Sequence, residues 1–355
     1  MRSQRRTAGL SALIIAGGSG TRFWPASRAS RPKPLFSVDG KRTLLANTVL
    51  RLQPLASPSR IFVLAASSHA AAFRRALRGL IPAGNLIIEP AARGTAVAIA
   101  YGAAVIERRT GPGVMVVLPA DHLIEPAAEF RASLSASAVL AASNQSLVVI
   151  GVPPTHPEPG FGYLKVGKAQ GRGFVVERFV EKPALAIARR MVRSGKYLWN
   201  AGMFVFSTDT LDAELRRIVP SLHSSVRRLV EMPAKGLARG YLRLAFDSFD
   251  REVVEKSKGV LGVRARFGWH DVGSWEGLRH AIGGQGGRIL RGNIIALDSD
   301  RVVAQAGRRL MVLFGAHDIV AIDTDDAVLV AHRSRSQELR RVSEELSRRG
   351  LRQYL

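Results

Sequence analysis

Short apolar runs alternate with longer stretches of helical spacing in the part of the chain that precedes Pro153. The runs are five or six residues long and are bounded by polar or glycine residues, a length typical of buried strands. The expected strands are residues 12–16, 61–65, 85–89, 114–119 and 147–152, and the expected helices are residues 43–52, 69–80, 95–108 and 129–143. Strands and helices that alternate in this way predict an α/β fold with a doubly wound, mostly parallel sheet covered on both faces.

Beyond Pro153 the regular alternation ends. Two segments there have the polar and apolar pattern of antiparallel or edge strands, and Pro183 precedes a stretch with helical spacing. The expected strands are residues 162–166, 174–181, 202–207 and 260–267, and the expected helices are residues 184–194 and 251–258.

A run of glycines at 283–287, with one glutamine among them, predicts a boundary between two domains. The first domain is expected to span residues 8–282 and the second residues 288–355. Short β-rich pieces fill most of the second domain, and a basic helix ends it. Ser334 and Gln337 have the spacing of a capping box at the start of that helix.

The composition excludes some chemistry. The chain has 355 residues and no cysteine, so disulfides and thiolate chemistry are excluded. The apolar run after the basic N-terminus stops at Gly17, far short of the about 20 residues that a membrane span needs. We therefore expect a soluble, cytoplasmic protein without a membrane partner. The formal net charge of +24 favours encounters with anions such as phosphorylated metabolites or nucleic acid.

A glycine-rich turn follows the first expected strand, in the sequence Leu-Ile-Ile-Ala-Gly-Gly-Ser-Gly-Thr-Arg at 13–22. Glycines allow backbone N–H groups to approach phosphate oxygens closely. The turn has neither the Walker spacing nor the dinucleotide pattern. Taken alone, it is compatible with a phosphate loop and with an ordinary turn.

The residues after this turn resolve that ambiguity. Phe-Trp-Pro-Ala-Ser-Arg at 23–28 and Arg-Pro-Lys-Pro-Leu at 31–35 complete a string that resembles the N-terminal motif of sugar-1-phosphate nucleotidylyltransferases. The tryptophan variant resembles the mannose-1-phosphate guanylyltransferase branch. The resemblance implies a Rossmann-like nucleotidyltransferase domain, with Arg22 on the triphosphate of GTP and Lys33 on the reacting phosphates. Both cations suit a reaction that builds charge on phosphoryl oxygens.

A second motif, Glu-Pro-Ala-Ala-Arg-Gly-Thr-Ala-Val-Ala-Ile at 89–99, resembles the segment that lies beside the nucleotide base in this family. Gly94 stands where the family pattern has asparagine, and Val97 stands where it has proline. Glu89 or backbone carbonyls could accept hydrogen bonds from guanine. The nucleotide-binding residues implied by the two motifs are Gly17, Gly18, Gly20, Thr21, Arg22, Glu89, Arg93 and Thr95.

Two aspartates are candidate metal ligands. Asp121 follows an apolar strand in Leu-Pro-Ala-Asp, and Asp271 lies in Trp-His-Asp-Val-Gly-Ser-Trp. Ligands in open α/β sheets bind at the carboxyl ends of strands, and Mg²⁺ commonly takes one or two carboxylates together with substrate phosphates. Each aspartate alone would more often cap a helix or turn. Their motif contexts match those in which the family binds Mg²⁺, so Arg22, Lys33, Asp121 and Asp271 are the expected catalytic set.

Three further motifs resemble the sugar-phosphate side of the family: Phe-Gly-Tyr at 161–163, Glu-Lys-Pro at 181–183 and Trp-Asn-Ala-Gly-Met-Phe at 199–204. They imply contacts from Gly162, Glu181, Lys182 and Asn200. Polar groups of this kind select for sugar hydroxyls, because an analogue that lacks a hydroxyl leaves them unpaired. The β-rich tail resembles the family's short left-handed β-helix, which is implied to support a homodimer.

The motifs occur in family order from about Leu10 to Ala331, and they predict that GTP and mannose 1-phosphate are converted to GDP-mannose and diphosphate for polysaccharide synthesis. Three alternatives remain open at this point. One is a relative specific for another sugar 1-phosphate or base, which the departures at Gly94 and Val97 allow. A basic nucleic-acid-binding protein would need aromatic residues among its cations, whereas aromatic content is 6%. An inactive regulatory homologue would have no chemical reason to retain all five of Arg22, Lys33, Asp121, Lys182 and Asp271.

Overall fold

The computed structural model describes residues 9–17, 20–28, 31–38, 40–282 and 288–355. Its contacts divide the chain into two compact units. Unit 1 comprises residues up to 16, 46–120 and 124–268, and unit 2 comprises residues 17–45, 121–123 and 269–355. The predicted domain boundary at 283–287 lies outside the described residues.

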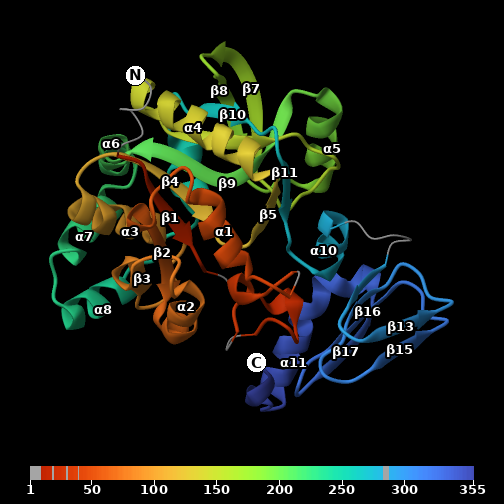
Figure 1. Ribbon diagram of the computed structural model, residues 1–355. Helices are drawn as coiled ribbons and strands as arrows, with labels where there is room; N and C mark the ends of the chain where they lie inside the picture. The colour runs from red at the N-terminus through yellow and green to blue at the C-terminus, as the bar shows by residue number, and fades with distance from the viewer. Residues whose placement is uncertain (1–8, 18–19, 29–30, 39, 283–287) are drawn as a thin grey trace. The chain divides into compact units, whose positions relative to one another are not determined.

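Unit 1 is built on a nine-stranded sheet with the order β3-β2-β1-β4-β9-β6-β10-β8-β7 (Figure 1). Its strands are β1 (Ser11–Ile15), β2 (Ile61–Ala66), β3 (Leu86–Glu89), β4 (Val114–Pro119), β6 (Val148–Val152), β7 (Tyr163–Gln170), β8 (Gly173–Val180), β9 (Tyr197–Ser207) and β10 (Leu261–Arg264).

Only part of the sheet has the parallel topology that the sequence predicts. β3, β2, β1 and β4 are mutually parallel. β9 then runs antiparallel to both β4 and β6, and β7 pairs with β9 as well as with β8, which closes this end of the sheet into a small mixed barrel. The expectation of a mostly parallel sheet is therefore wrong. A strand buried on both faces has the same apolar run whichever way it points, so its direction is not encoded in periodicity.

Nine α-helices are assigned to the described part of unit 1 or its border: α1 (Leu44–Leu52), α2 (Ala70–Leu77), α3 (Thr95–Thr110), α4 (Ala127–Asn144), α5 (Leu185–Ser194), α6 (Thr208–Ile218), α7 (Pro220–Leu229), α8 (Ala234–Leu242) and α9 (Phe249–Glu252). α3 contacts β1 and β2, and α4 contacts β4, β6, β9 and β10. α6, α7 and α8 gather beside α3 (Figure 1). Helices thus bury the apolar positions of the sheet in the core of the unit.

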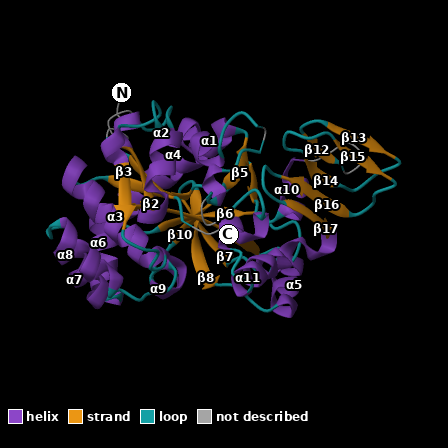
Figure 2. Cartoon of the chain, turned by 90° about the horizontal axis from the view of Figure 1, so that it is seen from below, coloured by secondary structure: helices purple, strands orange, loops and turns teal. Residues whose placement is uncertain are grey.

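Unit 2 combines the N-terminal loop with the C-terminal coil of short strands. The strands are β12 (Ile289–Arg291), β13 (Ile294–Leu297), β14 (Val303–Gln305), β15 (Met311–Phe314), β16 (Ile319–Asp323) and β17 (Val328–His332). They form a four-stranded sheet, β12-β14-β16-β17, and the pair β13-β15, which are stacked in Figure 2. Helices α10 (Trp275–Ile282) and α11 (Arg340–Arg348) complete the unit. No helix of the described residues combines the length and the apolar character needed to cross a bilayer.

Candidate active site

Three predicted catalytic side chains of unit 2 meet around one ammonium group. Lys33 opens a short 3₁₀ turn, Asp121 precedes β5 (His122–Glu125), and Asp271 ends β11 (Gly268–Asp271). Lys33 Nζ lies 2.6 Å from Asp121 Oδ2 and 3.4 Å from Asp271 Oδ1. We call these residues the carboxylate–lysine cluster. Residues far apart in the sequence are thus brought together as the motifs imply.

The cluster keeps its charges in a setting where Lys33 is buried and the two aspartates are half-buried. Burial alone would lower the pKa of Lys33, but the negative charges of Asp121 and Asp271 outweigh burial and raise it. Burial likewise would raise the pKa of Asp271, but the charge of Lys33, followed by His122, lowers it. The ammonium and the carboxylate of Asp271 therefore stabilise one another in their ionised forms.

Local packing holds the cluster in place. Trp269 Nε1 donates a hydrogen bond to His122 Nδ1 at 3.0 Å, and this contact joins β11, which ends at Asp271, to β5, which follows Asp121. On the loop that carries Lys33, Gly20 has φ +58°, and a Cβ there would collide with Ser27 Oγ and lie 2.8 Å from Lys33 Cβ. Glycine is required at this position both for the backbone conformation and for the close approach.

The two carboxylates fit a magnesium ion. Both already contact the same cationic group, so one cation can be reached from both. The described residues contain no group of three or more histidine, cysteine or acidic side chains that could hold a metal. Two carboxylates with remaining positions for phosphate and water is the arrangement typical of Mg²⁺ in nucleotide enzymes.

Arg22 is exposed next to this cluster and is held by the C-terminal part of the chain. Its Nη1 donates to Gln337 Oε1 at 3.0 Å, and a Cβ on Gly273 would lie 3.4 Å from the same nitrogen. The predicted capping box is therefore wrong: Gln337 contacts Arg22, and residues 333–339 form a 3₁₀ helix in which the His332 side chain accepts from Ser334 N. No local sequence signal identifies Gln337 as a partner of the arginine.

The signature loop, defined here as residues 20–28, is anchored by aromatic packing and by Arg28. Phe23 lies 5.0 Å from Trp275 between ring centroids. Arg28 is buried, and its Nη1 and Nη2 each approach an oxygen of Asp326 at 2.6 Å. Arg28 Nε also donates to Pro25 O at 2.8 Å. The planar guanidinium therefore joins the loop to the turn after β16 through several bonds.

Replacing Arg28 by lysine is expected to lower the free energy of unfolding by about 1–3 kcal/mol, because lysine cannot reproduce the bidentate contact with Asp326 while also reaching Pro25 O. Chemical denaturation measures this loss. Arg308→Lys is the matched control, since the Arg308 side chain is 92% exposed. Equal stability of both variants would show that the fork of Arg28 does not anchor the loop.

The predicted base-side residues lie in or next to the loop between β3 and α3 in unit 1. Glu89 is buried, and its Oε2 accepts a hydrogen bond of 2.6 Å from Tyr241 Oη. Burial raises the pKa of Glu89. Arg93 is half-buried, and among the described residues its Nε has no hydrogen-bond partner. Thr95 begins α3, and its Oγ1 accepts from Phe249 N at 2.9 Å. Arg93 is thus the group here with donor capacity left for a ligand.

The remaining nucleotide residues belong to unit 2. Gly17 is exposed, with open space where a Cβ would lie, and the half-buried Thr21 begins a 3₁₀ turn. Gly18 lies outside the described residues.

The predicted sugar-side residues of unit 1 are brought together. Asn200 N donates to Gly162 O at 2.8 Å, and a Cβ on Gly162 would lie 2.8 Å from Glu181 Oε2. Lys182 Nζ lies 3.2 Å from Glu181 Oε1, and its side chain is 55% exposed. Lys182 has φ +46°, an uncommon conformation for a residue with a side chain. Sequence reasoning missed one neighbour of this group, Asp250, whose carboxylate contacts Asn200.

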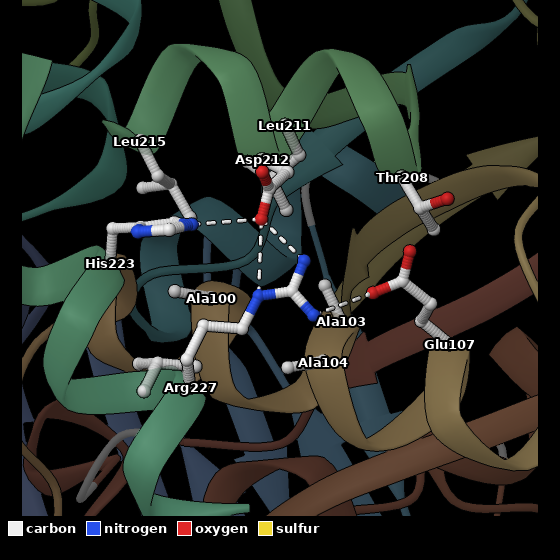
Figure 3. A pocket seen from close by; sticks show the side chains of 11 residues that line it. Ala100, Ala103, Ala104, Glu107, Thr208, Leu211, Asp212, Leu215, His223 and Arg227 are labelled. Carbon is white, nitrogen blue, oxygen red and sulfur yellow. Dashed lines mark hydrogen bonds and ion pairs between the residues drawn. The ribbon is translucent and has the colours of Figure 1, made fainter. Parts of the chain in front are cut away.

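A small cavity elsewhere in unit 1 carries charged side chains that are occupied with one another (Figure 3). Asp212 Oδ1 accepts from His223 Nε2 at 2.8 Å and from Arg227 Nε at 3.1 Å, and Arg227 Nη1 reaches Glu107 Oε2 at 3.3 Å. Burial would raise the pKa of Asp212, but its hydrogen bonds with Arg227 and His223 lower it. These ion pairs join α3, α6 and α7, and we assign the cluster a structural role.

Comparison with known proteins places two matching families along the chain. The family described as nucleotidyl transferase matches residues 11–284, and the mannose-P isomerase/GMP-like β-helix domain matches residues 292–346. Xanthan biosynthesis protein XanB of Xanthomonas campestris pv. campestris is 38% identical over 348 residues, which cover 95% of this chain and 73% of XanB. Mannose-1-phosphate guanylyltransferase of Escherichia coli K12 is 33% identical over 353 residues, which cover 95% and 73% of the two chains.

A solved structure is also similar over almost the whole chain. The crystal structure of mannose-1-phosphate geranyltransferase from Thermus thermophilus has a TM-score of 0.87 and 34% identity, and the match covers 96% of this chain and 99% of that one. Fold, cluster and sequence together define a nucleotidyltransferase with a C-terminal β-helix domain. Within that class, the chain belongs to the mannose-1-phosphate guanylyltransferase family.

Proposed function

We propose that this chain transfers GMP from GTP to α-D-mannose 1-phosphate, giving GDP-mannose and diphosphate, with Mg²⁺ held by Asp121 and Asp271. The observation that carries the proposal is the carboxylate–lysine cluster, in which both aspartates contact Lys33 within the family's motifs. Relatives that match nearly the whole of this chain, over 73% of their own length, bear the name of this activity.

The side chains of the chain itself bind and orient the reactants. Lys33 and Arg22 place positive charge on the triphosphate, where negative charge builds as the sugar-phosphate oxygen attacks the α-phosphorus in line. Lys182 neutralises the phosphate of the sugar, and Glu181 and Asn200 accept and donate hydrogen bonds to its hydroxyls. Bound Mg²⁺ would neutralise charge on the phosphate oxygens and orient them.

The structure bears on how guanine is recognised. Glu89 is buried and already accepts from Tyr241, so we infer that backbone carbonyls of the loop between β3 and α3 accept from the donor edge of the base. Gly94 has no side chain that would cover these carbonyls. The guanidinium of Arg93, whose buried Nε has no hydrogen-bond partner among the described residues, keeps donor capacity for an oxygen of the nucleotide.

The direct test follows diphosphate release from GTP and mannose 1-phosphate after removal of divalent metal with EDTA and again after addition of Mg²⁺. We expect no release with EDTA, restored release with Mg²⁺, and GDP-mannose as the second product. Full activity in EDTA would contradict metal binding by the two aspartates.

Replacing Lys182 by alanine is expected to raise the KM for mannose 1-phosphate by about 10-fold or more and to leave the KM for GTP unchanged, because a charge-assisted bond to phosphate is lost. Steady-state kinetics with each substrate varied in turn measures both constants. Lys196→Ala, which removes another exposed lysine of unit 1, is the control. An unchanged KM for the sugar phosphate would exclude Lys182 from that site.

Some expectations stay predictions: the homodimer, the left-handed sense of the β-helix, the domain boundary between 282 and 288, and a cytoplasmic location without nucleic-acid partners. We infer that the second domain also includes residues of the signature loop, because they pack with the C-terminal part of the chain in unit 2.

A further inference from the structure

Asp250 lies beside the sugar-side residues, although no motif of the sequence drew attention to it. It belongs to the short helix α9, which begins after Ser248. Asn200 Nδ2 donates a hydrogen bond to Asp250 Oδ1 at 2.6 Å. A short hydrogen bond from an amide to a carboxylate is among the stronger polar contacts in a protein.

This contact fixes the orientation of the Asn200 amide. Asn200 Oδ1 accepts from Gly202 N at 3.1 Å, so its oxygen and its nitrogen are each assigned a partner. Because an ionised carboxylate only accepts, the Nδ2 group must face Asp250. The amide keeps one N–H and one lone pair for a further partner. Which of them points toward a ligand is thus set by Asp250 together with Gly202 N.

Asp250 also adds a second carboxylate to this part of unit 1. Burial raises the pKa of Asp250 to about 6, and the negative charge of Glu181 contributes in the same direction. The hydrogen bond from Asn200 opposes this rise in the pKa, and the positive charge of Lys182 opposes it to a smaller extent. A half-buried pair of acceptors that its neighbours do not fully neutralise is satisfied by the O–H donors of a polyhydroxyl ligand.

The segment that carries Asp250 also touches the base-side residues. Phe249 N donates to Thr95 Oγ1 at 2.9 Å, and Ala96 N donates to Asp247 O at 3.4 Å. A displacement of residues 247–250 would therefore alter hydrogen bonds both at the start of α3 and at Asn200. This continuity lies within unit 1.

We propose that Asp250 is a positioning residue of the sugar subsite, which orients the Asn200 amide and so determines selectivity for the sugar. The proposal rests on the proposed function, since it assigns a sugar phosphate to this group of residues. Asp250 acts through Asn200: the amide, held between Asp250 and Gly202, presents a fixed pattern of one donor and one acceptor to the hydroxyls. A sugar whose hydroxyl points differently does not match that pattern.

The test compares Asp250→Asn with the wild type. Asparagine has the same shape but no charge, and it can donate as well as accept. Only Gly202 N then still specifies the orientation of the Asn200 amide, which is held less firmly. We expect the KM for mannose 1-phosphate to rise about 10-fold, kcat to change less than about 3-fold, and the KM for GTP to stay constant. The preference for mannose 1-phosphate over glucose 1-phosphate should fall about 10-fold. Glu255→Gln, a change at an exposed carboxylate on the following turn, should alter none of these constants.

The pH dependence separates positioning from a structural effect. The charged groups that face Asp250 are Glu181 and Lys182, and Arg251 is its neighbour in the chain. Because the pKa of Asp250 is raised to about 6, its carboxylate takes up a proton as the pH falls below that value. The ratio of KM values, variant over wild type, should therefore fall toward 1 between pH 7.5 and pH 5.5. Titration of the substrate phosphate cancels in this ratio.

An unchanged KM for mannose 1-phosphate in Asp250→Asn would overturn the proposal. Equal rises in both KM values, together with a lower Tm and a ratio independent of pH, would show a structural role only. If the wild type releases no diphosphate from GTP and mannose 1-phosphate, the proposed function fails. Calorimetric binding of mannose 1-phosphate to the variants then tests whether Asp250 positions Asn200. Weaker binding to Asp250→Asn than to Glu255→Gln would support positioning, and equal binding would overturn it.

Discussion

Asp271→Asn is expected to lower kcat by about 10³-fold or more at saturating Mg²⁺, with a Tm within a few degrees of the wild type. Asparagine preserves the shape of the side chain but removes the negative charge that a divalent cation requires. The fold should tolerate the change, because Lys33 keeps its closer partner, Asp121, at 2.6 Å. Stopped or coupled assays of diphosphate release measure kcat.

Asp325→Asn is the matched control, since this aspartate of unit 2 is 78% exposed. Its kcat should equal that of the wild type. Near-normal turnover by Asp271→Asn at saturating Mg²⁺ would exclude Asp271 as a metal ligand. A collapse of Tm in the same variant would instead assign the charge pair with Lys33 a dominant role in stability.

Restoring the family's asparagine at Gly94 is expected to destabilise this chain by about 2–4 kcal/mol. Gly94 has φ +87°, and a Cβ there would collide with Phe246 O and lie 2.7 Å from Asp247 O. Both oxygens are backbone atoms of the segment that precedes α9. They cannot relieve the clash by a change of side-chain rotamer. The presence of glycine at position 94, where the family pattern has asparagine, is therefore explained by the close approach of residues 246–247 to the start of α3.

The control for Gly94→Asn is Gly111→Asn. Gly111 has a similar conformation, with φ +78°, but nothing lies within 4 Å of the position of its Cβ. Gly111→Asn should therefore be destabilised only by the strained backbone conformation, which costs about 1–2 kcal/mol of unfolding free energy. Urea denaturation of both variants gives the difference. Equal losses of unfolding free energy in the two variants would show that residues 246–247 move aside at little cost. The close approach would then not explain why glycine occupies position 94.

The sequence predicted local elements well where burial gives a clear period. The first expected strands and helices correspond closely to β1 to β4 and α1 to α4, because each is a short apolar run or an amphipathic stretch between turn residues. The reversal of β9 was not predicted, since strand direction depends on the partners available in the folded sheet. α6, α7 and α8 were also missed, although Ser207 caps α6 and Pro220 begins α7.

The candidate site divides in the same way. Motifs identified Lys33, Asp121 and Asp271, and the structure brings them together. Partners that act through single long-range contacts carry no signal in one sequence: Gln337 on Arg22, Tyr241 on Glu89, and Asp250 on Asn200. Such contacts depend on tertiary packing alone. Only the folded structure brings these partners together.

Diphosphate release from a crossed set of GTP, ATP, UTP and dTTP with mannose 1-phosphate and glucose 1-phosphate tests the central claim most directly. The account predicts that GTP with mannose 1-phosphate is turned over with a kcat/KM about 100-fold or more above every other pair, a difference equivalent to about 3 kcal/mol of transition-state binding. A higher kcat/KM for another pair, or no release from any pair in the presence of Mg²⁺, would contradict it.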